Sequence, residues 1–265
     1  MHDLIHDLAQ LVAGAECKLV DFDVKNINEK IHHISCPFSI GSSFIDTLKS
    51  SLKANKIRTF LLTSSSMYSI DALNESMLNT FILSFKSLHA LDFHGLKITK
   101  VPNPVRKLMH LKYLDLSQNK SIKNLPDSFT RLWNLQTLKL QVYEKLEELP
   151  RDIRKLVNLK DLDNSGWSSL SHMPSGLGQL TCLQTLPLFV VSKDPPSISK
   201  HVGGLGELNQ LNNLRGKLEI IYLEQLEDAN LESKAANLRE NEHLEKLILR
   251  WSYYRYQGDN NDDEK

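Results

Sequence analysis

The feature of this sequence that most constrains its fold is a Val-Pro, Leu-Pro or Met-Pro dipeptide that recurs every 24 residues, at Pro102, Pro126, Pro150 and Pro174. Leucines precede these prolines at a constant L-x-x-L-x-L spacing, as in Leu111, Leu114 and Leu116, then Leu135, Leu138 and Leu140. A second apolar pair follows each proline, namely Val105/Leu108, Phe129/Leu132, Ile153/Leu156 and Leu177/Leu180. Such a fixed period indicates a chain built from repeated structural units.

Each unit has a simple physical interpretation. The last two leucines of L-x-x-L-x-L alternate, as side chains on one face of a short strand must. Proline then turns the chain, because it cannot donate to a strand ladder, and the apolar pair returns a helical or 3-10 segment to the same core. One unit cannot bury its own leucines, whereas stacked units bury each other's. The sequence therefore predicts an α/β fold, a leucine-rich-repeat solenoid with a curved parallel sheet, preceded by a short N-terminal helical segment.

The repeat frame also suggests how the chain is organised outside its most regular part. Strands are expected in Lys56–Leu62, Lys217–Ile221 and His243–Trp251, and a helix is expected over Leu226–Glu245. Gly203, Gly204 and Gly206 are not a phosphate loop, because no Lys-Ser/Thr follows them. We predict a helical segment at 1–22, a connecting segment with the first strand at 23–55, leucine-rich repeats at 56–191, a loop at 192–206, further irregular repeats at 207–256 and a disordered tail at 257–265.

Composition narrows the class of partner. The chain has a formal net charge of zero and no apolar run long enough to span a membrane, so neither a nucleic acid nor a membrane is expected as a partner. Its three cysteines are scattered, which fits a reducing compartment and predicts a cytoplasmic location. The charge is nevertheless uneven, with nine Lys/Arg against three Asp over 85–132 and nine Asp/Glu against five Lys/Arg over 207–248. This asymmetry either biases the docking of a partner or reflects an unpatterned solvated surface.

The residues between and beside the strand leucines point away from the core, onto the concave face of the sheet. They can vary without disturbing the fold, which suits a protein-recognition surface, although a merely solvated sheet face fits equally well. No nucleophile with a base and no His/Cys cluster occurs among them, so no enzyme activity and no metal site are predicted. The expected face comprises Asp92, His94, Tyr113, Asp115, Ser117, Thr137, Lys139, Gln141, Asp161, Asp163, Ser165 and Phe189.

The first residues contain H-D-x-x-H, in His2, Asp3 and His6, which differs by one methylene from the zinc-protease motif H-E-x-x-H. On a helix the two histidines would share one face, as a zinc pair does. However, aspartate is shorter than the usual general base, and no downstream motif supplies a third ligand. The apolar residues of this stretch form an ordinary amphipathic stripe, and we do not interpret the motif as a zinc site.

The same residues resemble another family. Met1-His2-Asp3, followed by His6-Asp7-Leu8-Ala9, is similar to the Met-His-Asp motif of plant nucleotide-binding leucine-rich-repeat (NLR) disease-resistance proteins of the coiled-coil type. KIHHIS (Lys30–Ser35), KIRTFLL, the Leu-Pro repeats, LNNLRGKLEI (Leu211–Ile220) and HLEKLILRWS follow in that family's usual order. The resemblance covers essentially the whole chain, and it identifies 1–22 as the end of a winged-helix subdomain.

The resemblance implies what the chain binds. In the family, His2 would sense the phosphate of bound ADP and Asp3 would support it, but the phosphate-binding loop is absent here. The expected cofactor is therefore none, with ADP or ATP only in a full-length relative. The implied function is a truncated protein–protein recognition module of an intracellular immune receptor, whose partner is a pathogen effector, a guarded host protein or the receptor's own nucleotide-binding module. The alternative is a stand-alone Leu-Pro-repeat scaffold or signalling adaptor.

Two departures from the ideal repeat carry expectations of their own. The asparagine that normally follows the strand occurs only as Asn119, while Tyr143, Trp167 and Val191 take its place elsewhere. We therefore expect an irregular curve. No capping repeat is recognisable after the last predicted strand, so an apolar end face is expected there.

Overall fold

A computed structural model describes residues 16–19, 30–36, 56–62, 74–167, 169–192 and 200–251. The motif residues His2 and Asp3 and the predicted tail at 257–265 lie outside the described residues. So does most of the predicted helical segment at 1–22, of which only 16–19 are described.

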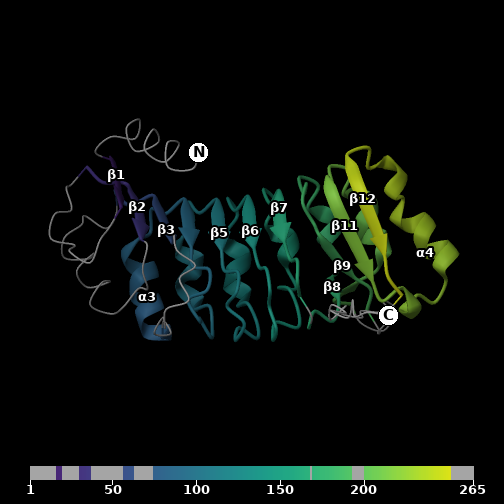
Figure 1. The fold of residues 1–265 in the computed structure, drawn as a ribbon, viewed down its shortest axis with the longest axis horizontal. Coiled ribbons are helices and arrows are strands. Elements are labelled where there is room, and N and C mark those ends of the chain that lie inside the picture. The colour runs from purple at the N-terminus through teal and green to yellow at the C-terminus, as the bar shows by residue number, and fades with distance from the viewer. Residues whose placement is uncertain are drawn as a thin grey trace, which may run out of the picture.

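Short parallel strands lie side by side along the long axis of the molecule (Figure 1). Seven of them pair in sequence order with no crossover, which is the arrangement that stacked repeats produce. They are β1 (Cys17–Leu19), β2 (His33–Cys36), β3 (Thr59–Leu62), β4 (Ala90–Asp92), β5 (Tyr113–Asp115), β6 (Thr137–Lys139) and β7 (Asp161–Asp163). A second parallel sheet follows, in the order β12 (Leu244–Leu249), β11 (Gly216–Ile221) and β9 (Leu188–Val190).

The segments that return the chain between strands are mostly 3-10 helices. Two of them, at Asn103 and Asp127, begin directly after the repeat's proline. In three repeats the proline carbonyl accepts a hydrogen bond from the amide three residues later, from Val105 to Pro102 at 3.1 Å, from Phe129 to Pro126 at 2.9 Å and from Ile153 to Pro150 at 3.0 Å. Proline suits this position because it needs no donor there. These returns are η4 (Asn103–Lys107), η5 (Asp127–Arg131), η6 (Ile153–Lys155), η7 (Leu177–Gln179), η8 (Leu205–Gln210), η9 (Leu223–Gln225) and η10 (Leu238–Glu240).

The core lies between the strands and their returns, and it runs continuously through the repeats. Leu114, Leu138 and Leu162 pair with one another across β5, β6 and β7 and are at most 1% exposed. The apolar residues after each proline, such as Phe129 and Ile153, are fully buried opposite them. The predicted leucine-rich-repeat solenoid, with its parallel sheet and 3-10 returns, is confirmed.

A ladder of side-chain donors joins successive repeats at the position after the strand. The Asn119 amide donates to the Phe93 carbonyl at 2.8 Å, the Tyr143 hydroxyl donates to the Leu116 carbonyl at 2.8 Å, and the Trp167 indole N–H donates to the Leu140 carbonyl. The three acceptors occupy equivalent positions 23 or 24 residues apart. Tyrosine and tryptophan therefore replace the usual asparagine without leaving a buried carbonyl unpaired.

The segment between β3 and β4 contains an α-helix, α3 (Glu75–Ser84), which the sequence analysis did not predict. The Asn74 side chain caps this helix by accepting from the Met77 amide at 2.9 Å. Phe81 packs edge-to-face against Phe60 of β3, with ring centroids 4.9 Å apart, so the helix extends the core toward this end. The strand β1 also differs from the prediction, because it lies inside the segment expected to be helical.

The predicted loop at 192–206 contains a strand and a helix start in its described part. Strand β10 (Val202–Gly203) pairs antiparallel with β8 (Met173–Pro174), and η8 begins at Leu205. A Cβ at Gly203 would lie 2.8 Å from the Pro174 carbonyl oxygen, so only glycine allows this close pairing. The carboxylate of Glu207 then accepts from the Gly176 and Gly178 amides, which fixes the segment to the fourth repeat.

The last two strands, β11 and β12, confirm the predicted strand positions, but the helix before β12 is shorter than expected. Helix α4 (Ala229–Ala236) ends at Asn237, whose φ of 43° is left-handed, and the chain continues through η10 instead of remaining α-helical to Glu245. Asparagine tolerates this backbone conformation, which commonly terminates helices. Leu247 and Leu249 of β12 are 41% and 47% exposed.

Candidate protein-binding face

The predicted recognition residues lie on one face of β4 to β7 and on the turns just after these strands. The structure brings eleven of the twelve together there, with side chains from four successive repeats forming columns. Their exposure is lower than expected, because Asp92, Asp115 and Ser117 are at least nine-tenths buried. These three are therefore largely structural, and the more accessible positions lie on β6 and β7.

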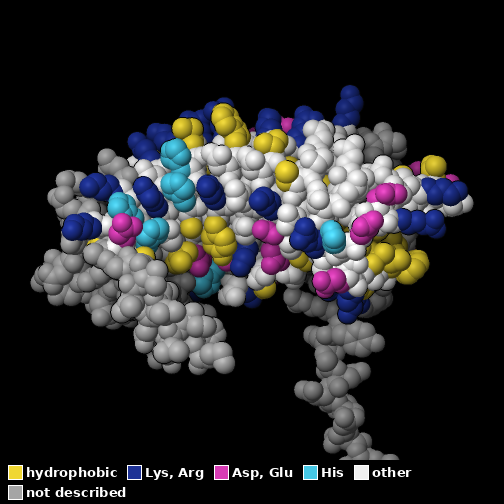
Figure 2. Space-filling view, turned by 90° about the horizontal axis from the view of Figure 1, so that it is seen from above, with side chains coloured by type: hydrophobic (Ala, Val, Ile, Leu, Met, Phe, Trp, Pro, Cys, Tyr) yellow, Lys and Arg dark blue, Asp and Glu magenta, His cyan; other side chains and the backbone are white. Residues whose placement is uncertain are grey.

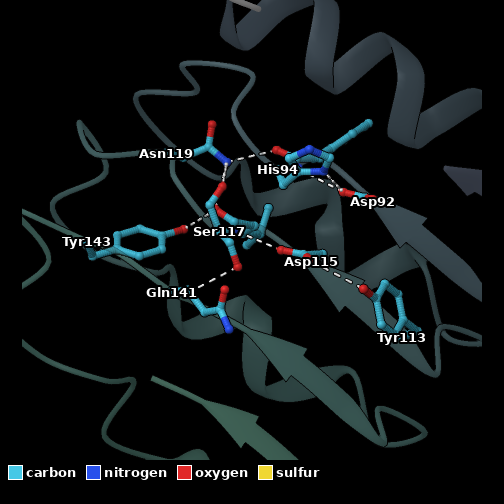
Figure 3. Close-up of polar contacts among 10 residues, drawn as sticks. Asp92, His94, Tyr113, Asp115, Ser117, Asn119, Gln141 and Tyr143 are labelled. Atoms are coloured by element: carbon cyan, nitrogen blue, oxygen red, sulfur yellow. Dashed lines mark hydrogen bonds and ion pairs between the residues drawn. The ribbon is translucent and has the colours of Figure 1, made fainter. Parts of the chain in front are cut away.

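The Asp115 carboxylate holds the turn after β5 through hydrogen bonds (Figure 3). One of its carboxylate oxygens accepts the Ser117 backbone N–H at 2.8 Å, and the other accepts the Tyr113 hydroxyl at 3.3 Å. The Ser117 hydroxyl in turn accepts the backbone N–H of Gln141, in the next repeat, at 3.2 Å. These contacts hold the turn after β5 in one conformation, which reduces the ordering cost of binding a partner there.

Asp92 repeats the arrangement one unit earlier. Its Oδ1 accepts both the His94 backbone N–H at 2.9 Å and the His94 ring Nδ1 at 2.7 Å. Burial raises the pKa of Asp92 above its ordinary value, and the hydrogen bonds from His94 only partly offset this effect. Burial likewise raises the pKa of Tyr113, so its hydroxyl remains a donor at every physiological pH.

On β6 and β7 the side chains connect neighbouring strands. Asp161 accepts from the Thr137 hydroxyl at 3.0 Å on one side and from the Thr185 hydroxyl at 2.8 Å on the other. Asp163 accepts from the Gln141 side chain and from the Ser165 hydroxyl, the latter at 2.8 Å. The aspartates are thus fixed in place by neutral donors, which leaves their negative charge uncompensated by these contacts.

The face as a whole is acidic. Its carboxylates are Asp92, Asp115, Asp161 and Asp163, and the basic residues near them are His94 and Lys139. The ammonium group of Lys139 lies 5.6 Å from the centre of the Tyr113 ring, in a cation–π contact. Such a surface complements a basic or hydrogen-bonding protein surface.

Among the described residues, no group of three or more His, Cys, Asp or Glu side chains could hold a metal ion. The carboxylates accept hydrogen bonds from hydroxyl, amide and imidazole groups within the network, an arrangement suited to fixing side chains in position. Where the chain is described, no helix is both long and apolar enough to cross a membrane.

Phe189 was wrongly placed on this face. Its side chain is fully buried, and it pairs with Ile220 of β11, which is also buried. The reason is that the alternation of the earlier strands ends after Pro187, and all three residues of β9 are buried. At the junction, the Asn164 side chain donates to the Leu188 carbonyl at 2.7 Å and accepts the Leu188 N–H at 3.1 Å, so a side chain completes the strand pairing.

The sequence analysis also missed a row of exposed apolar side chains outside the concave face. Met109, Trp133 and Val157 each follow the last leucine of a 3-10 return, 24 residues apart. The same 24-residue period that identifies the leucines also identifies these residues. In the next two repeats the equivalent position is polar, at Thr181 and Asn212.

Comparison with known proteins agrees with this architecture. The family described as "Leucine-rich repeat region" matches residues 65–262. Solved structures show the same fold at low sequence identity. An internalin from Listeria monocytogenes matches with a TM-score of 0.54 and 15% identity, covering 84% of this chain and 56% of that one. The functional domain of InlJ from the same bacterium matches with a TM-score of 0.50 and 17% identity, covering 88% of this chain and 46% of that one.

Two proteins of Arabidopsis thaliana are similar over nearly the full chain. One, named as a disease resistance protein, is 42% identical over 95% of this chain, which spans 17% of that protein's length. The other, named as a disease resistance RPP13-like protein 1, is 38% identical over 98% of this chain, which spans 24% of that protein's length. The resemblance to plant disease-resistance proteins is thus confirmed, and the chain belongs to the leucine-rich repeat region family.

Proposed function

We propose that this chain is the protein-recognition module of a plant intracellular immune receptor, located in the cytoplasm. The observation that carries the proposal is the 42% identity to a disease resistance protein over 95% of the chain. A second such relative supports a receptor role over a stand-alone scaffold or adaptor. The acidic concave face of β4 to β7 is the surface proposed to bind the partner, which is a pathogen effector, a guarded host protein or the receptor's own nucleotide-binding module.

The geometry of the face supports recognition by a rigid surface. Asp161 and Asp163 each accept two hydrogen bonds from neighbouring side chains, so they present fixed charges to a partner. Preorganised groups lose little side-chain entropy on binding. A partner that contacts β6 and β7 would therefore need basic or donor groups opposite these two carboxylates.

Proximity labelling in plant cells tests this proposal directly. The chain carrying Asp163→Lys should lose a set of labelled proteins that the wild-type chain retains, because charge reversal places like charges opposite a basic partner. A matched Glu147→Lys variant, which reverses an exposed carboxylate away from the strands, should retain that set. Equal labelling by all three chains would contradict recognition through the concave face.

We also propose that the chain holds no nucleotide and catalyses no reaction by itself. In this proposal His2 and Asp3 would contact ADP only within a full-length receptor that supplies a phosphate-binding loop. Titration calorimetry with MgATP should show no saturable binding to the isolated chain. Saturable binding that is lost in His2→Ala would contradict this part of the proposal.

A further inference from the structure

A second candidate surface lies outside the concave face and carries exposed apolar and basic side chains, whereas the concave face is polar and acidic. The row of exposed apolar side chains, Met109, Trp133 and Val157, is 57%, 59% and 55% exposed. They occupy equivalent positions of three successive repeats, and we refer to them as the apolar row. Exposed apolar side chains are common singly, whereas an aligned set marks an interaction surface.

The backbone of the apolar row is held in place by the following repeat. The Asn134 amide donates to the Met109 carbonyl at 2.7 Å, and the Asn158 amide donates to the Trp133 carbonyl at 2.7 Å. Two turns are thus fixed although their side chains project into solvent. A partner would bind them without first ordering the loops that carry them.

Beside the row lies a groove of about 860 Å³, which Trp133 helps to line. Six Lys and Arg side chains and His201 face this groove, against two aspartates. One of these aspartates, Asp152, is already paired with Arg154 and Lys155. The basic residues that line the groove are Arg106, Arg131, Arg151, Arg154, Lys155, Lys200 and His201.

The remaining positive charge is not balanced locally. In the part of the chain that the structure describes, no carboxylate lies within ion-pair distance of Arg106, Arg131 or Arg151. The guanidinium groups come from successive units, so a ligand that follows the repeat axis would meet one after another. Figure 2 shows Lys and Arg side chains interleaved with apolar ones along one margin of the molecule.

We propose that the apolar row and the arginine groove together form a docking surface for an acidic protein segment that also carries apolar side chains. Arginine binds carboxylates through two parallel hydrogen bonds, and the apolar row buries the segment's hydrophobic side chains. A nucleic acid fits less well, because its bases would stack on Trp133 but would form no comparable contact with the aliphatic side chains of Met109 and Val157. This surface is separate from the concave face, so it goes beyond the recognition proposed above.

Fluorescence anisotropy with defined probes tests the proposal on the full chain. The main probe is a labelled peptide in which Asp and Glu alternate with Leu and Phe. The control probes are the same peptide with Lys for every acid, the same peptide with Ser for every Leu and Phe, and a single-stranded oligothymidylate. Only the main probe should bind, and raising the salt concentration to about 0.15 M should weaken the binding without abolishing it, since the apolar contacts are not screened.

Variants assign the binding to the proposed residues. Trp133→Ala should weaken the main probe about 30-fold, as expected for a central aromatic anchor, and Arg131→Ala should weaken it about tenfold. Lys145→Ala, which removes an exposed lysine that does not line the groove, should leave it unchanged and serves as the matched control. Because Trp133 and Arg131 are exposed, circular dichroism should show that all three variants fold.

Three results would overturn the proposal. The first is no binding of the main probe. The second is equal binding of the Ser-substituted peptide with no effect of Trp133→Ala, which would reduce the groove to nonspecific charge attraction. The third is equally tight, Trp133-dependent binding of the oligothymidylate, which would assign the surface to nucleic acid. None of these results bears on the concave face, so the two proposals fail separately.

Discussion

The concave face and the apolar row are built from the same repeats, yet they treat their side chains in opposite ways. On the concave face, Asp115, Asp161 and Asp163 are partly or fully buried and bonded to neighbouring strands or turns. On the apolar row, Met109, Trp133 and Val157 project into solvent, and side-chain amides of the next repeat bond only to the backbone of Met109 and Trp133. Substitutions on the first face should therefore change stability as well as binding, whereas substitutions on the second should change binding alone.

The two tryptophans provide the largest expected contrast. Trp167 is fully buried, and its indole N–H donates to the Leu140 carbonyl, so Trp167→Ala should lower the free energy of unfolding by about 3–5 kcal/mol. Trp133→Ala should change it by no more than about 0.5 kcal/mol. Urea titration of the two variants measures both values. A cost of several kcal/mol for Trp133→Ala would show that the apolar row belongs to the core.

Adjacent residues of β6 test the strand register that defines the concave face. Leu138 is fully buried and Lys139 points to the concave side, so Leu138→Ala should cost about 2–5 kcal/mol and Lys139→Ala no more than about 0.5 kcal/mol. Thermal or urea unfolding gives both numbers. Equal costs would mean that the strand is placed one residue out of register, which would exchange its two faces.

Asp115 tests whether the concave network stabilises the fold. Asp115→Ala leaves the Ser117 amide and the Tyr113 hydroxyl without their acceptor, and it should cost about 1–3 kcal/mol. Asp115→Asn retains an acceptor oxygen at the same place, so it should cost less than the alanine variant. If both variants unfold at the wild-type urea concentration, the hydrogen bonds of Asp115 contribute nothing to stability.

The smallest expected effect depends on pH. Burial raises the pKa of folded Asp92 above its unfolded value, so folding favours the protonated carboxyl. The stability from this group is complete below the unfolded pKa, about 3.9, and is lost as the pH rises through the folded pKa. Wild-type protein should therefore lose stability relative to Asp92→Asn as the pH rises from about 3.9 toward neutral. A difference that stays constant across this range would mean that the pKa of Asp92 is not raised by folding.

Much of the fold was predictable because it depends on a repeat whose leucines and prolines recur at a fixed spacing in the sequence. The leucines at 111, 114 and 116 and their equivalents 24 residues later fix the strands, the core and the concave columns. What the sequence did not reveal depends on contacts between repeats. Tyr143 and Trp167 replace asparagine only because their polar atoms reach the carbonyls of the previous unit. Phe189 is buried because β9 pairs with a strand about 30 residues further along the chain.

The candidate site was predicted in position but not in exposure. Spacing places Asp92 and Asp115 on the concave side, yet it does not show that each accepts an amide N–H two residues later and is thereby buried. The apolar row was missed for a different reason. The leucine spacing predicts which positions lie inside, and the position shared by Met109, Trp133 and Val157 is not one of them.

Hydrogen exchange measured residue by residue tests the stacked-repeat arrangement most directly. The amides of Phe93, Leu116 and Leu140 each donate to a carbonyl of the next repeat, at 2.8, 3.0 and 2.8 Å. They should therefore be protected together, in a pattern that recurs every 23 or 24 residues, with lower protection in the turns between them. Continuous protection over ten or more residues between Leu108 and Leu162, as an α-helix would give, would contradict the stack and both of its binding surfaces.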